Sequence, residues 1–214
     1  MWTSVLAVIA HPDDASAGLG AVLDAFVMAG ARVDVLCLTH GQTWTLDDAP
    51  GDLAALRGTE IPSADDILGR LRAEMSDFPD GALRELCQTT MASAVVDVAD
   101  SCHPDGFLVF DAPDVPGYLD HASATSVALL AAETLDLPVL GWSLSETARE
   151  QLRGEFGDSP TGHDAGQIDL RVTIERARQR MASRGNAGLA VPGSVPRRRL
   201  ELLGETESLR WLRR

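Results

Sequence analysis

Short apolar segments separated by longer amphipathic stretches run through the first two thirds of the chain. Several of these segments show no alternation of apolar and polar residues, which is typical of strands buried on both faces of a parallel sheet. The clearest predicted strands are residues 5–10, 32–38, 107–110 and 138–142. Residues 70–78 are a weaker strand prediction, and residues 168–172 are predicted to form an edge strand.

Helical spacing of apolar residues fills the stretches between these strands. In residues 16–30, apolar side chains recur three and four positions apart, and Gly30 is a suitable helix end. The same reasoning predicts a long helix from Asp80-Gly81 to about residue 101, and another from Asp120-His121 to about residue 133. Further helices are predicted at residues 52–69, 145–153, 175–181 and 207–213.

Strands that alternate with helices predict an α/β fold, in which a Rossmann-like, mostly parallel sheet is flanked by helices. The length of 214 residues fits one domain. Within it, we expect residues 1 to about 143 to form the sheet core, and residues from about 144 to 214 to form a C-terminal portion that faces the substrate. Right-handed crossovers would place the carboxyl ends of the parallel strands at one edge of the sheet.

Composition narrows the possible partners. The chain is 45% hydrophobic and carries a net charge of −14, which would repel nucleic acid and anionic membranes. No segment approaches the length of a membrane span, and the N-terminus has no basic signal region. Cys37, Cys87 and Cys102 are widely spaced, so we interpret them as reduced buried thiols of a cytoplasmic protein. The sequence is compatible with a homo-oligomer.

Polar residues suited to metal binding follow the first predicted strand. Pro12 ends that strand, so His11, Asp13 and Asp14 lie just beyond its carboxyl end. Ligands bind at this edge in open α/β sheets, and imidazole and carboxylate groups are common ligands of divalent metals. Alternatively, the two aspartates could cap the next helix, and His11 could be a packed loop histidine.

Two more histidines belong to the same predicted edge. His40 follows the second strand, where it could equally be a capping or surface residue, and His121 follows the strand at residues 107–110. His11, Asp14 and His121 would leave one coordination position open for water. Asp13 beside such a metal would be a plausible general base. The residues therefore predict metal-assisted hydrolysis.

The sequence Ala10-His11-Pro12-Asp13-Asp14 resembles the A-H-P-D-D-E motif of the PIG-L/LmbE-like family of zinc-dependent N-acetylglucosamine-type deacetylases. The resemblance extends over nearly the whole chain. Further similar segments are Leu38-Thr39-His40-Gly41, Arg57 with Glu60, Phe78-Pro79-Asp80-Gly81, Asp120-His121, Leu140-Gly141-Trp142 and Leu209-Arg210-Trp211-Leu212.

The resemblance implies an LmbE-like fold and one zinc ion per chain, bound by His11, Asp14 and His121. It implies that Asp13 is the general base and that Asp120 contacts the metal ligands without binding the metal itself. Arg57 and His40 would contact the substrate. The expected reaction is removal of an acyl group, such as acetyl, from an N-acyl amino sugar or a related small amide.

This chain departs from the family pattern at two places close to the expected chemistry. Ala15 replaces the glutamate that follows Asp-Asp, and Tyr118 and Leu119 replace the first two residues of the H-P-D-H motif. Tyr118 can still donate a hydrogen bond to an oxyanion, although its ordinary pKa near 10 suits proton transfer less well.

Two other hypotheses follow from these residues. The departures motivate a catalytically altered family member that is a metal-stabilised sugar-binding or scaffold protein. A nucleotide-binding protein is the remaining alternative, since Gly18-Leu19-Gly20 follows a strand. However, the third glycine is missing, and the aspartates at the turn would repel phosphate.

Overall fold

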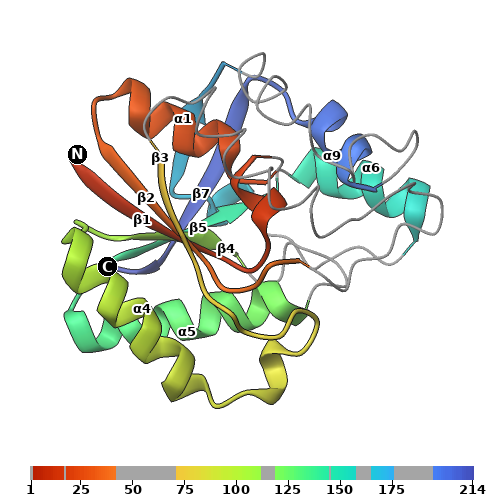
Figure 1. Ribbon diagram of the computed structural model, residues 1–214. Helices are drawn as coiled ribbons and strands as arrows, with labels where there is room; N and C mark the ends of the chain where they lie inside the picture. Colours follow the sequence, from red (N-terminus) through yellow and green to blue (C-terminus); the bar gives the residue numbers. More distant parts are fainter. Residues whose placement is uncertain are drawn as a thin grey trace.

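The computed structural model describes residues 2–16, 18–41, 71–111, 119–144, 146–157, 165–175 and 195–214. Within them lies one seven-stranded sheet of order β3-β2-β1-β4-β5-β7-β6 (Figure 1). The strands are β1 (Ser4–Ile9), β2 (Arg32–Cys37), β3 (Leu71–Met75), β4 (Phe107–Phe110), β5 (Val139–Ser143), β6 (Leu170–Thr173) and β7 (Thr206–Arg213). Strands β1 to β5 are parallel, whereas β7 runs antiparallel to both β5 and β6. The predicted α/β class with a mostly parallel sheet is confirmed.

Helices cover both faces of the sheet. The α-helices are α1 (Gly20–Met28), α4 (Gln88–Cys102), α5 (Leu119–Leu135), α6 (Glu146–Phe156) and α9 (Val195–Leu202). Short 3₁₀ helices are η1 (Pro12–Ala15), η2 (Leu83–Glu85) and η4 (Ala165–Gln167). Helices α4 and α5 lie side by side on one face, and α1 covers the opposite face (Figure 1).

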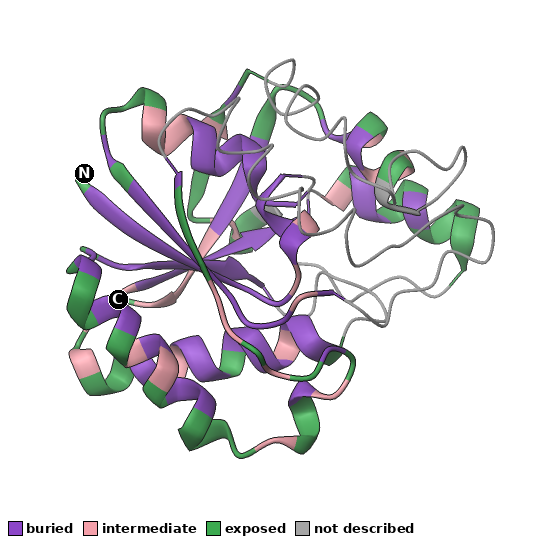
Figure 2. Ribbon diagram, viewed as in Figure 1, coloured by how far each residue is buried: buried purple, intermediate pink, exposed green. Residues whose placement is uncertain are grey.

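The central strand β1 divides the hydrophobic core into two layers. Val5, Ala7 and Ile9 belong to the cluster that also contains residues of α1, while Leu6 and Val8 belong to the cluster with α4 and α5. Every residue of β1 is buried, and Figure 2 colours the central strands of the sheet mostly as buried, whereas the edge strand β3 is largely exposed. This burial on both faces explains why the sequence of β1 shows no alternation.

The structure corrects the prediction of a helix at residues 207–213, because these residues belong to strand β7. Leu209 and Trp211 pack with the α1-side cluster, whereas Leu212 packs with the α4/α5-side cluster. Side chains that alternate between two faces have the period of a strand. Pairing with both β5 and β6 decides the conformation, and this tertiary contact overrides the local helical pattern.

Two predicted helix starts were also wrong. The long helix α4 begins at Gln88, not at Asp80, because the chain makes a turn at Gly81 and the 3₁₀ helix η2 before it. Helix α1 begins at Gly20, and the residues before it include η1. The predicted helix at residues 52–69, and residues 176–181 of another predicted helix, lie outside the described residues.

Two findings concern the surface of the molecule. Cys37 and Cys102 are buried as predicted, but Cys87 is exposed, since it stands just before the first turn of α4. Among the helices that the structure describes, none combines the length and the apolar character needed to cross a bilayer.

Candidate metal centre

The segment that carries His11 and Asp14 leaves the sheet at the carboxyl end of β1. Its backbone stays attached to the chain after β2, since Leu38 N–H donates to Ile9 O (2.9 Å) and Thr39 N–H donates to Ala10 O (3.1 Å). Pro12 then opens η1, whose turn brings Asp14 back toward His11. Asp14 Oδ2 accepts a hydrogen bond from the backbone N–H of His11 (3.0 Å). The short turn therefore fixes the two side chains relative to one another.

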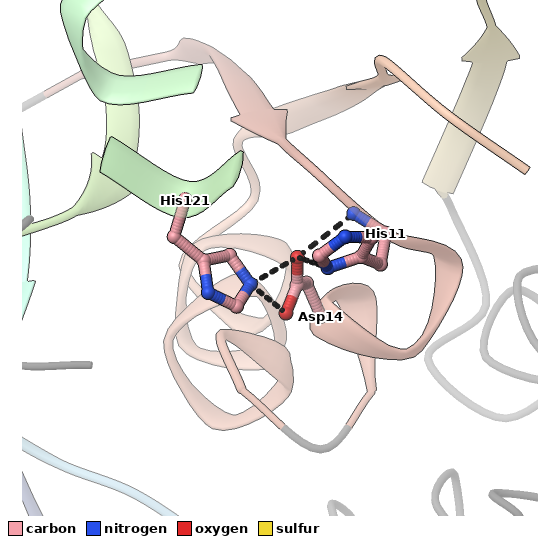
Figure 3. A group of neighbouring side chains, drawn as sticks. All are labelled: His11, Asp14 and His121. Carbon is pink, nitrogen blue, oxygen red and sulfur yellow. Dashed lines mark hydrogen bonds and ion pairs between the residues drawn. The ribbon is translucent and has the colours of Figure 1, made fainter. Parts of the chain in front are cut away.

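His121 reaches the same place from the first turn of α5. Its Nε2 lies 2.9 Å from both Oδ1 and Oδ2 of Asp14, although the residues are 107 positions apart (Figure 3). His11 Nδ1 lies 3.9 Å from Asp14 Oδ2, and the two imidazole rings are 5.0 Å apart between centroids. Asp14 and His121 are 6% and 4% exposed. The three groups predicted as metal ligands thus meet in a nearly buried cluster.

The donor set fits a divalent metal ion. Ligand atoms of His11, Asp14 and His121 all lie within 4.8 Å of one another. Two imidazole nitrogens and one carboxylate oxygen are the ligands that catalytic zinc sites use, with a further position left for water or substrate. A buried carboxylate is costly unless positive charge compensates it, and a metal ion would provide that compensation.

The charges around His11 and Asp14 favour their ionised forms. Burial works to lower the pKa of His11, but hydrogen bonds to Asp120 and Asp80 and the charges of Asp14 and Asp13 raise it to about 10. Burial likewise opposes ionisation of Asp14, yet its pKa is lowered by the charge and hydrogen bond of His121 and by His11. Asp14 is therefore held as a carboxylate, the form in which it can bind a cation.

Two further carboxylates, those of Asp80 and Asp120, lie near the other ring nitrogen of His11. Asp80 Oδ1 lies 3.0 Å and Asp120 Oδ2 3.6 Å from His11 Nε2. Asp120 Oδ2 also accepts the backbone N–H of Gly81 (2.7 Å), and its Oδ1 accepts that of Leu83 (3.1 Å). Despite burial, these bonds from His11, Gly81 and Leu83 lower the pKa of Asp120. Asp80 and Asp120 form a second possible donor set with His11.

The remaining predicted site residues are placed less closely or not at all. Asp13 lies on η1, half-buried, where its charge contributes to the raised pKa of His11. His40 Nε2 lies 2.8 Å from Asp77 Oδ1 at an exposed position and belongs to neither donor set. Arg57 and Tyr118 lie outside the described residues.

The sequence analysis assigns Asp80 no role in the site, although it places Asp80 at the start of the long helix and in a segment that resembles the family. The residues after β3 run beside the end of β2, since Ser76 N–H donates to Cys37 O (2.8 Å) and Phe78 N–H donates to Leu38 O (3.2 Å). Asp80 therefore arrives at the same sheet edge as His11. A carboxylate shortly after a predicted parallel strand was the signal that could have found it.

Comparisons with known proteins give one family match. The model of the PIG-L family, described as GlcNAc-PI de-N-acetylase, matches residues 6–132. No curated protein sequence gives a significant match to the chain.

Three solved structures illustrate the likeness in fold. The A40926 pseudoaglycone deacetylase Dbv21 has 19% identity and a TM-score of 0.73, with 98% of this chain and 96% of that chain covered. The N,N'-diacetylchitobiose deacetylase of Pyrococcus horikoshii has 17% identity and a TM-score of 0.69, with 99% and 84% covered. GalB, the 4-carboxy-2-hydroxymuconate hydratase of Pseudomonas putida, has 18% identity and a TM-score of 0.73, with 98% and 96% covered.

The family match spans more than half of the chain and includes His11, Asp14 and His121, which the structure brings together. This protein is therefore a member of the PIG-L family.

Proposed function

We propose that the protein is a metal-dependent hydrolase that removes an acyl group, such as acetyl, from an N-acyl amino sugar or a related small amide. The observation that carries the proposal is the meeting of His11, Asp14 and His121 in a chain of the PIG-L family. Two of the similar structures are described as deacetylases, one of the A40926 pseudoaglycone and one of N,N'-diacetylchitobiose, which supports an amino-sugar substrate.

His11, Asp14 and His121 would hold one zinc ion per chain. Zinc in such a site supplies Lewis acidity, which polarises an amide carbonyl and lowers the pKa of water. Asp13 follows His11 and Pro12 on the same turn and would accept the proton of the attacking water. Because Asp13 is half-buried while Asp14 is nearly inaccessible, the two neighbouring carboxylates suit different roles, one facing substrate and one facing the metal.

Other residues would bind the substrate and stabilise the transition state. We assign Arg57 and His40 to substrate contacts and Tyr118 to hydrogen bonding of the developing oxyanion. Asp120 would not bind the metal itself. It would hold the metal ligand His11 in place through its contacts with His11 and with the backbone of residues 81–83. The C-terminal portion from about residue 144 would complete the substrate side of the site.

The fold alone does not select this reaction, because one similar structure is described as a hydratase. The replacements at Ala15 and Tyr118 favour a second candidate, a family member that binds metal and sugar without hydrolysing an amide. The two candidates differ in whether acyl groups are released.

The test begins with the zinc-loaded protein and measures acetate release from N-acetylglucosamine and its conjugates. We expect release by the wild type and a loss of roughly 100-fold or more in Asp13→Asn, since a positioned general base contributes about 10²–10⁴-fold. Zinc content, measured by elemental analysis, should be the same in both proteins. Asp97→Asn, on an exposed position of α4, is the matched control and should keep full turnover.

Equal turnover in Asp13→Asn and wild type would refute the assignment of the base. A wild type that binds zinc and N-acyl amino sugars but releases no acyl group would support the non-hydrolytic candidate instead. A wild type that binds no zinc would contradict both.

A further inference from the structure

Both ring nitrogens of His11 have acidic neighbours, and the neighbours of Nδ1 and of Nε2 have different roles. On one side its Nδ1 faces Asp14, which also contacts His121. On the other side its Nε2 lies 3.0 Å from Asp80 Oδ1, a hydrogen-bond distance. An imidazole can offer only one nitrogen to a metal while the other donates its proton, so the acceptor of that proton determines which nitrogen binds the metal.

Asp120 is poorly suited to be a metal ligand in this arrangement. Both of its oxygens already accept backbone N–H groups, from Gly81 and Leu83, and Oδ2 is 3.6 Å from His11 Nε2. These bonds join the first turn of α5 to the segment that follows Asp80. Asp120 therefore fixes the position of the segment that contains Asp80.

Asp80 is itself built into the sheet edge. It is 8% exposed, and its Oδ1 lies 3.4 Å from Thr39 Oγ1. The same hydroxyl lies 2.9 Å from Ala10 O, immediately before His11. The position of the Asp80 carboxylate is thus tied to the chain after β1 as well as to α5.

We propose that Asp80 is a positioning residue for His11, accepting its Nε2–H so that Nδ1 points toward Asp14 and His121, and that Asp120 holds Asp80 in place through Gly81 and Leu83. This inference rests on the proposed metal site. It assigns His11, Asp80 and Asp120 to the support of one metal ion and not to a second one. It also gives a role to a carboxylate that the sequence alone did not single out.

The experiment measures zinc affinity by competition with a chromophoric chelator at a fixed pH. We expect Asp80→Ala to weaken zinc binding by roughly 10–100-fold, the usual effect of losing a partner of a metal-bound histidine. Asp80→Asn should weaken it less, since its amide oxygen can still accept the His11 proton. Asp77→Asn is the matched control, because Asp77 also contacts a histidine but one outside both donor sets, and its zinc affinity should equal that of the wild type.

Two spectroscopic measurements separate positioning from a general loss of structure. In the zinc-loaded, ¹⁵N-labelled wild type, His11 should carry its proton on Nε2 and bind zinc through Nδ1. The absorption bands of the cobalt-substituted protein should shift in Asp80→Ala and not in Asp77→Asn. A His11 that is protonated on Nδ1, or a zinc affinity unchanged in Asp80→Ala, would overturn the inference while leaving the metal site itself in place. A wild type that fails to bind zinc would instead overturn the proposed function.

Discussion

Individual carboxylates in this protein are matched by donors from distant parts of the chain. Asp105, in the turn before β4, accepts the backbone N–H of Thr3 (2.5 Å), the hydroxyl of Thr3 (2.9 Å) and the backbone N–H of Ser4 (3.1 Å). These three hydrogen bonds lower the pKa of the Asp105 carboxyl below its usual 3.8, and the bond from the Thr3 backbone contributes most. One exposed side chain therefore secures the start of the central strand β1.

A carboxyl whose pKa is lower in the folded state adds stability above its unfolded pKa, and this stability is lost as the pH falls through the folded pKa. Asp105→Asn should therefore be less stable than the wild type at neutral pH. The difference in the free energy of unfolding should stay constant down to about pH 5 and then shrink as the wild-type carboxyl is protonated. Urea unfolding from pH 7 to pH 3 measures it.

Thr3→Val provides a second variant for this test, because it removes one of the three donors. At neutral pH, Thr3→Val should lose less stability than Asp105→Asn loses. Its difference from the wild type in the free energy of unfolding should also shrink at low pH. A difference between Asp105→Asn and wild type that does not vary with pH would argue that the carboxylate charge plays no part.

At the scale of elements, β7 is joined to the end of β4 by an ion pair. Arg210 Nε donates to Asp111 Oδ2 (2.7 Å) and Nη2 donates to Oδ1 (3.1 Å), while Ser143 Oγ at the end of β5 donates to Oδ2 (3.1 Å). Asp111 is 2% exposed, whereas the Arg210 side chain is 28% exposed. This two-point contact crosses β5 and reinforces the antiparallel pairing of β7 with it.

Replacing Arg210 with leucine would leave the buried Asp111 carboxylate without its guanidinium partner. We expect Arg210→Leu to lower the free energy of unfolding by about 2–3 kcal/mol, somewhat less than the ~3–5 kcal/mol of a fully buried pair, because Arg210 is partly exposed. The double variant with Asp111→Asn should recover part of this loss, as urea unfolding of the four proteins would show. Additive losses in the double variant would mean that the two side chains do not interact.

Elements with strong local patterns could be predicted from the sequence. The central strands and helix α5 were found because burial on both faces of a strand and the periodicity of a helix are visible in a single segment. Strand β7 was missed because apolar residues at 209 and 212 also fit a helix, and only its neighbours β5 and β6 resolve the ambiguity.

The same distinction applies to the site. The proximity of His11, Asp14 and His121 was predictable because each stands next to a recognisable strand or helix end and belongs to a motif. The contact of Asp80 with His11 depends on how the chain after β3 runs beside the end of β2, and that of Asp111 with Arg210 depends on the antiparallel pairing of β7. The position of each aspartate shortly after a strand is visible in the sequence, but its contact partner follows only from tertiary geometry.

For the molecule as a whole, the proposed metal centre would connect two parts of the chain. His11 and Asp14 come from the turn after β1, and His121 comes from α5 beyond β4. A ligand that binds the folded state alone stabilises it by RT ln(1 + [L]/Kd). Metal binding here should therefore oppose unfolding of the whole sheet and not only order one turn.

We expect zinc to raise the melting temperature of the chelator-stripped protein, with a stabilisation of about 2.7 kcal/mol when free zinc exceeds the Kd 100-fold. Differential scanning calorimetry across a zinc titration measures the effect. The Asp14→Asn variant should lose most of the response, because it lacks the carboxylate shared by both histidines. A melting temperature independent of zinc in the wild type would contradict a metal site that depends on folding.

The position of β7 inside the sheet has a consequence for biosynthesis. Strand β5 pairs with β4 on one side, but its other neighbour is made only when the ribosome has passed residues 206–213. Until then, Val139–Ser143, which are buried in the finished fold, present an open strand edge. Such an edge is prone to association with other chains. Completion of this sheet must therefore wait until β7 has been synthesised, and a nascent chain stalled before β7 would be a natural substrate for chaperones.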